Sequence, residues 1–301
     1  MKAGNAWSLS GPRTLDLEGP VDRVSVRIVG GTVNVVGTDA GTARLEVSAF
    51  EGPPLMVTHE DGALTVTYED LPWKGFLKWL DPKGRRRSAA VSLAVPAGTR
   101  VEVGVVGAGA VVSGIEGPTH ICGVTGDTTL VGLTGDVRAE TVSGGVDAQG
   151  LTGQLRFTSV SGDLTVIEAY GSAVQAESVS GNMIVDVDSR TADLTLATVS
   201  GEIAIRIPHP ADTRVEASTA SGAVSSAFEE LKVTGHWGTK QLIGTLGEGN
   251  GRLKASTVSG AIALLRRPQT EDEPPYGAGE PPHNGDAGPH ADSPTSSGKA
   301  L

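Results

Sequence analysis

The sequence predicts an all-β protein, a single-chain β-solenoid with about 18–21 residues per coil and an irregular β-rich N-terminal part. The prediction depends on a recurring glycine, on alternating apolar and polar residues between these glycines, and on an unusual composition. Of the 301 residues, 42 are glycine and only 4% are aromatic. A core with so few rings must be filled by Val, Leu, Ile and Ala, and we expect the glycines to form corners where the backbone needs positive φ.

The repeat is clearest in the middle of the chain. Val-Ser-Gly ends at Gly144, Gly162, Gly181 and Gly201, so the spacings are 18, 19 and 20 residues. Variable turns lie between these corners, which predicts a two-sided coil with Val-Ser-Gly along one edge. We expect the corners to stack as a ladder whose hydroxyls bond between coils, although a ligand-binding strip is the alternative. The ladder comprises Ser143, Gly144, Ser161, Gly162, Ser180, Gly181, Ser200, Gly201, Ser221, Gly222, Ser259 and Gly260.

The segments between corners alternate like half-buried strands. In Asp163–Glu168, Leu164 and Val166 fall on one face while Asp163 and Thr165 fall on the other. A single pair of such strands cannot bury its apolar face, but stacked coils share one core. The glycine-rich run 103–112 lacks the third glycine and the following helix of a dinucleotide-binding loop, so we assign it to the repeat.

The repeat divides the chain into three parts. Residues 1–95 are a β-rich N-terminal part or cap, continuous with the solenoid, in which residues 56–68 predict a hairpin around Asp61-Gly62. Residues 96–267 are the solenoid, with a longer excursion over 223–257 and a final coil over 253–265. Residues 268–301 hold seven prolines and five glycines but few large apolar residues, so we expect a disordered tail.

One segment is both aromatic and basic within an acidic protein. Such segments dock on anionic membranes or acidic partners, although a loop that plugs the open end or side of the sheet is the alternative. Its candidate contact residues are Trp73, Lys74, Phe76, Lys78, Trp79, Arg85, Arg86 and Arg87.

Other chemistry is weakly represented. The net charge of −11 disfavours nucleic acid as a partner. The only cysteine, Cys122, excludes an internal disulfide, and we expect it to be a small buried residue, with a reactive thiol as the alternative. The six histidines show no metal spacing, so we expect no metal, no cofactor and no enzyme activity. No signal peptide or membrane span is visible, which predicts a cytoplasmic protein, peripheral to the membrane if the basic segment docks.

The corner motif also carries a family resemblance. Thr141-Val142-Ser143-Gly144-Gly145-Val146 and its copies at 159–164, 198–203 and 257–262 resemble a bacterial domain-of-unknown-function family labelled "putative adhesin", of actinobacterial type. The resemblance covers roughly residues 10–267. It implies a right-handed β-solenoid without catalytic residues, and some relatives are linked to cell-envelope stress.

These observations favour a non-catalytic scaffold that binds a protein or an envelope component, linked to the cell envelope or its stress response. Two alternatives stay open. One is a self-assembling filament that associates through exposed coil ends. The other is a polysaccharide-acting β-helix enzyme, which would need a carboxylate or basic cluster in a groove on one face.

Overall fold

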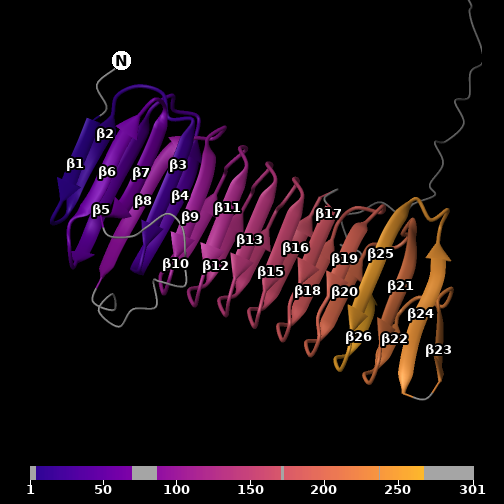
Figure 1. Ribbon diagram of the computed structural model, residues 1–301. Helices are drawn as coiled ribbons and strands as arrows, with labels where there is room; N and C mark the ends of the chain where they lie inside the picture. Colours follow the sequence, from indigo (N-terminus) through magenta and orange to yellow (C-terminus); the bar gives the residue numbers. More distant parts are fainter. Residues whose placement is uncertain (1–4, 70–86, 171–172, 237, 268–301) are drawn as a thin grey trace, which may run out of the picture. The chain divides into compact units, whose positions relative to one another are not determined.

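Two long β-sheets lie face to face and enclose one apolar core (Figure 1). The computed structural model describes residues 5–69, 87–170, 173–236 and 238–267. Within these ranges all regular secondary structure is β-strand. No helix that could cross a membrane is found in them. The predicted tail, 268–301, lies outside the described residues.

The first sheet has 14 strands in the described part of the chain. In spatial order they are β1 (Asn5–Leu9), β6 (Leu55–Glu60), β7 (Ala63–Tyr68), β3 (Arg23–Ile28), β9 (Arg100–Val105), β11 (Thr119–Gly123), β13 (Val137–Thr141), β15 (Leu155–Ser159), β17 (Ala173–Glu177), β19 (Asp193–Ala197), β25 (Gly251–Thr257), β21 (Thr213–Thr219), β24 (Thr239–Leu246) and β23 (Lys232–His236).

The second sheet has 12 strands over the same described ranges. Their order is β2 (Arg13–Leu17), β5 (Ala43–Glu51), β8 (Ser88–Pro96), β4 (Gly30–Thr38), β10 (Gly109–Ser113), β12 (Thr128–Val131), β14 (Val146–Gln149), β16 (Leu164–Ala169), β18 (Met183–Val187), β20 (Ile203–Ile207), β26 (Ile262–Arg266) and β22 (Val224–Ser226).

The middle of both sheets is a parallel stack that confirms the predicted solenoid. Each coil contributes one strand to each sheet, and equivalent residues of successive coils are register partners. Thr119 pairs with Val137, which pairs with Leu155, so these coils are 18 residues long. Leu155 then pairs with Val174 and Val174 with Leu194, which gives coils of 19 and 20 residues.

Alternation along each strand builds the core. Ile121, Phe157 and Leu196 point inward from the 14-stranded sheet, and Leu130, Val166 and Ile205 point inward from the 12-stranded sheet. The polar residues between them face outward, as period-two patterning requires. Burying one such aliphatic side chain stabilises the fold by roughly 1.5–3 kcal/mol.

Residues 1–95 join this stack directly. β3 and β4 pair in parallel with β9 and β10, as the strands of a coil would. Beyond them β1, β6 and β7 in one sheet, and β2, β5 and β8 in the other, are joined by antiparallel pairs. The predicted hairpin is confirmed as β6 and β7, whose turn residues Asp61 and Gly62 have φ of 48° and 76°.

The C-terminal coil does not lie at the end of the stack. β25 lies between β19 and β21, and β26 lies between β20 and β22, so the chain returns and fills a gap between two earlier coils (Figure 1). The expected excursion contains β22, β23 and β24, and β24 pairs antiparallel with β21. Asp212 holds the returning loop, because its carboxylate accepts hydrogen bonds from the Gly249 and Asn250 amides at 2.7 and 3.1 Å.

Candidate functional site

The aromatic and basic segment predicted as a surface contact falls mostly outside the described residues. This applies to Trp73, Lys74, Phe76, Lys78, Trp79, Arg85 and Arg86. The eighth residue, Arg87, has its guanidinium carbon 5.6 Å from the centroid of the Tyr68 ring, within the range of a cation–π contact. Burial raises the pKa of Tyr68, whose ring closes this part of the core.

The Val-Ser-Gly corners stack along one edge, but their spatial order differs from their order in the chain. The corner with Ser259 lies between those with Ser200 and Ser221, because the last coil is inserted there. Each serine hydroxyl donates to a main-chain carbonyl of the adjacent coil. The donor–acceptor pairs, 3.2–3.5 Å apart, are Ser143–Val124, Ser161–Val142, Ser180–Val160, Ser200–Val179, Ser259–Val199 and Ser221–Val258.

The residue before each of these serines is a solvent-facing valine at several corners. Val160 and Val258 keep 51% and 52% of their surface exposed. A second hydroxyl, three residues before each glycine, is buried instead. Ser159, Ser178, Thr198 and Thr257 accept the amide hydrogen of that glycine at 2.7–3.2 Å. The repeated hydroxyls of this edge are therefore engaged in holding the corners together.

The corner glycines are required by close packing and not by positive φ, which corrects the sequence-based expectation. A Cβ on Gly201 would overlap the carbonyl oxygen of Gly181, and the same holds from coil to coil. The stacked series is Gly126, Gly144, Gly162, Gly181, Gly201, Gly260 and Gly222. Positive φ occurs at the opposite edge, at Gly114, Gly132 and Gly150, and in the next coil at Glu168 with φ of 57°.

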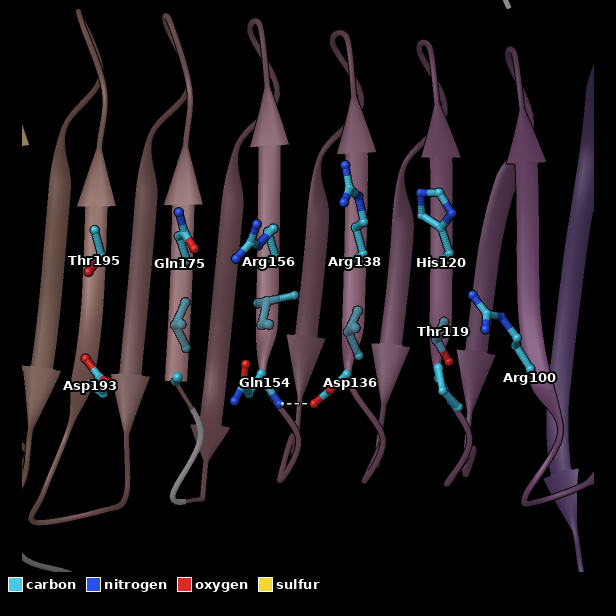
Figure 2. A pocket seen from close by; sticks show the side chains of 15 residues that line it. Arg100, Thr119, His120, Asp136, Arg138, Gln154, Arg156, Gln175, Asp193 and Thr195 are labelled. Carbon is cyan, nitrogen blue, oxygen red and sulfur yellow. Dashed lines mark hydrogen bonds between the residues drawn. The ribbon is translucent and has the colours of Figure 1, made fainter. Parts of the chain in front are cut away.

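The best-formed hollow in the described structure lies on the outer face of the 14-stranded sheet. It is shallow, has a volume of about 540 Å³, and spans β9 to β19. Figure 2 shows two rows of side chains that cross these strands. One row contains His120, Arg138 and Arg156, here named the basic row, and continues into Gln175 and Thr195. The other contains Asp136, Gln154 and Asp193.

The rows follow from coil geometry. His120, Arg138 and Arg156 are successive register partners, so one coil length separates each from the next. Asp136 caps the next coil, because its Oδ1 accepts the Gln154 amide hydrogen at 3.2 Å. Asp127 and Asp163 do the same for Gly145 and Asn182 at 3.0 and 2.7 Å. These corner acids are therefore turn residues.

Charges in the hollow are only partly paired. Arg100 lies 3.6 Å from Glu102, and Arg138 forms an ion pair with Glu140. Within the described part of the chain, Arg156 has no ion pair although it lies beside Arg138. Like charges directly opposite on neighbouring strands destabilise a sheet. An anion bound across these two guanidinium groups would relieve that repulsion.

Next to the basic row, three potential metal ligands come together. His120 and Cys122 lie two residues apart on β11, so both face outward, and Glu140 is the register partner of Cys122 on β13. Their ligand atoms all lie within 4.8 Å of one another, and His120 Nε2 is 3.4 Å from Cys122 Sγ. Sequence analysis missed this group, because it compared histidines with one another and expected Cys122 to be buried. Cys122 is in fact half-buried on the outer face.

The electrostatic environment of this group is mixed. Burial raises the pKa of the Cys122 thiol to about 11, and the charge of Glu140 adds to the effect, while Arg138 and Arg27 oppose it. Burial also lowers the pKa of the Arg27 guanidinium, against the opposing charge of Glu102. The thiol is therefore protonated at neutral pH unless a ligand displaces the proton.

Comparisons with known proteins were made on the whole chain. A search of curated proteins finds no match. A crystal structure titled a putative adhesin from Bacteroides fragilis matches 85% of this chain and 98% of its own, with 14% identity and a TM-score of 0.42. A structure titled a putative cell adhesion protein from Clostridium sporogenes matches 85% of this chain and 100% of its own, with 10% identity and a TM-score of 0.28.

The family comparison is more extensive in sequence. The model described as Toastrack DUF4097, a domain of unknown function, matches residues 26–265. The match begins within β3 and ends within β26, so it takes in the parallel stack, the basic row and the inserted coil. The chain is a member of the Toastrack DUF4097 family.

Proposed function

We propose that this protein is a non-catalytic binding scaffold whose partner is an extended, acidic polysaccharide of the cell envelope. The observation that carries the proposal is the pair of adjacent guanidinium groups on Arg138 and Arg156, with Arg156 free of ion pairs in the described structure. Guanidinium groups match carboxylates in a bidentate geometry, and they are more weakly hydrated than ammonium groups. The envelope as the location of the partner follows the family resemblance.

The shape of the hollow supports an extended ligand. The basic row crosses three coils at a spacing of roughly 4.8 Å per coil and continues into the amide of Gln175 and the hydroxyl of Thr195. A ligand lying across the strands would therefore meet one polar side chain on each coil. Because the hollow is shallow and open, it favours a long chain over a small enclosed substrate.

The carboxylates of the hollow argue against glycoside hydrolysis. Asp136 and Asp193 precede β13 and β19, which are three strand spacings apart, or roughly 14 Å. Glycosidases of either stereochemistry hold their two carboxyl groups within about 9.5 Å. Asp136 is also engaged in the corner hydrogen bond to Gln154. We therefore assign the hollow a binding role.

The test is binding of the full chain to immobilised oligogalacturonate, measured by biolayer interferometry at low and physiological salt. The variant Arg138→Gln/Arg156→Gln should bind at least about tenfold more weakly, since each lost charge-assisted hydrogen bond contributes about 1.5–3 kcal/mol. The matched control is Arg13→Gln/Arg44→Gln, which removes the same charge from exposed positions on β2 and β5. Equal losses in both variants, or no binding by the unmodified chain, would refute the proposal.

Contact with an anionic membrane through residues 73–87 is a separate proposal. It is supported by the composition of that segment, and Arg87 is its one described member. Salt-sensitive co-sedimentation with anionic liposomes should be lost when Trp73 and Trp79 are changed to alanine and Arg85–Arg87 are neutralised. Binding that survives these changes would assign the segment to structure.

Self-association through the ends of the stack is the remaining proposal. The outermost strands of the 14-stranded sheet, β1 and β23, each pair antiparallel with their neighbours, so the parallel coil pattern is interrupted at both ends. Edge strands still offer free backbone groups for pairing. Sedimentation velocity over a wide concentration range tests this, and a monomer at every concentration would rule out a filament.

A further inference from the structure

We infer that His120, Cys122 and Glu140 form a binding site for a transition-metal dication of the zinc class, with one coordination position open to solvent. Among the described residues, these three supply one imidazole nitrogen, one sulfur and one carboxylate oxygen within 4.8 Å of one another. Nitrogen, sulfur and carboxylate oxygen are the donors that zinc uses in proteins, and three protein ligands with a fourth open position are a common arrangement. This inference is independent of the proposed polysaccharide binding.

The distances agree with a tetrahedral centre. A Zn–N bond of about 2.0–2.1 Å and a Zn–S bond of about 2.3 Å place the two ligand atoms roughly 3.5 Å apart at the tetrahedral angle. His120 Nε2 and Cys122 Sγ are 3.4 Å apart. The protein therefore already holds two donors at the separation that a metal requires, with little reorganisation of either side chain.

The backbone fixes this juxtaposition. His120 and Cys122 share the outward face of β11, and the parallel register sets Glu140 of β13 beside Cys122. Both strands lie in the middle of the stack, flanked by β9 and β15, so the ligand positions are set by hydrogen-bonded sheet. Sites built on strands are held more closely than sites on loops.

Two competing interactions must be released when the metal binds. Glu140 leaves its ion pair with Arg138, and the Cys122 thiol loses its proton to solvent as the sulfur–metal bond forms. The ion pair is partly exposed, with side-chain exposures of 58% and 39%, so its loss costs little. The positive charges of Arg27 and Arg138 near the thiol are balanced by Glu102 and Glu140.

The experiment uses cobalt as a spectroscopic probe on the full chain, purified without a polyhistidine tag and stripped of metal with a chelator. Titration with Co²⁺ should produce a sulfur-to-cobalt charge-transfer band that saturates at one equivalent. Cys122→Ser should abolish the band, and His120→Gln and Glu140→Gln should each weaken binding at least about tenfold. The matched control, Glu177→Gln, removes a carboxylate two coils along the same row as Glu140 and should bind normally.

Two results would overturn the inference. One is the absence of a charge-transfer band at millimolar Co²⁺. The other is unchanged affinity in both His120→Gln and Glu140→Gln, which would show binding by a lone thiol. If a variant fails to fold, the unmodified chain supplies a second measurement, since Zn²⁺ should slow alkylation of Cys122 while Mg²⁺ should not. Equal alkylation rates with and without Zn²⁺ would also overturn it.

Discussion

Replacing Gly201 by alanine tests whether close backbone packing holds the coils together. A Cβ at this position would lie 2.6 Å from the carbonyl carbon of Gly181 and would overlap its oxygen. Carbon atoms pack best at roughly 3.5–4.0 Å, so the two coils must separate locally by about 1 Å. The obstacle is backbone on both sides, because Gly260 stacks on Gly201 in the same way. Overpacking typically costs about 1–3 kcal/mol, and we expect about 3 kcal/mol here.

Urea unfolding followed by far-ultraviolet circular dichroism measures the effect, with midpoints compared under identical conditions. The matched control is Gly98→Ala, at a corner where an added Cβ meets nothing within 4 Å and where φ is not positive. That variant should stay within about 0.5 kcal/mol of the unmodified protein. If Gly201→Ala were as stable as Gly98→Ala, the corner glycines would not be required by close packing, and this account of the edge would be wrong.

Two further predictions concern single residues at loops. Glu168 has positive φ where earlier coils have glycine, so Glu168→Gly should raise the free energy of unfolding by about 0.5–1 kcal/mol; a lower urea midpoint would contradict this. Hydrogen bonds from the Asn250 side chain and backbone lower the pKa of Asp212 below 3.8, so its contribution to stability is present above that pH and is lost as the pH falls through the lowered pKa. The difference in unfolding midpoint between the unmodified protein and Asp212→Ala should therefore shrink in strong acid, and a difference that grew with acidity would reverse the assignment.

The solenoid could be predicted because its two determinants are local. Period-two alternation fixes which side chains face the core, and glycine spacing fixes the coil length, as Leu164 and Val166 illustrate within a coil whose neighbours lie 18 and 19 residues away. Sequence reasoning attributed the corner glycines to positive φ, because it had no view of the adjacent coil. The requirement at Gly201 comes from the carbonyl group of Gly181, a contact between residues 20 positions apart.

The position of the last coil could not be predicted from the repeat alone. Coils with the same corner motif stack equally well, so Thr257–Gly260 fits against Thr198–Gly201 as well as Thr219–Gly222 would. The structure adds a constraint from pairing. β21 already pairs antiparallel with β24 on one side, which leaves its other side for β25. The long excursion between β21 and β25 was the sequence signal that a return was feasible.

The candidate metal site, in contrast, was available from the sequence once the coil length was known. Residues 18 positions apart are register partners in this part of the stack, so Cys122 predicts a neighbour at position 140, which is glutamate. Period-two alternation then places His120 on the same face as Cys122. The same arithmetic aligns Arg138 with Arg156.

Later coils gain residues without losing these rows, because the extra residues enter turns. The first lengthening falls between Val166 and Ala169, where the strand register shifts beside Glu168, and the adjacent β15–β17 pairing continues in order from Leu155 to Thr158. Residues on the strands are consequently constrained by their neighbours in both adjacent coils, while the turns are free to vary. A surface that must present side chains at a fixed spacing is therefore best placed on the strands of this fold, which is where the basic row and the three potential metal ligands lie.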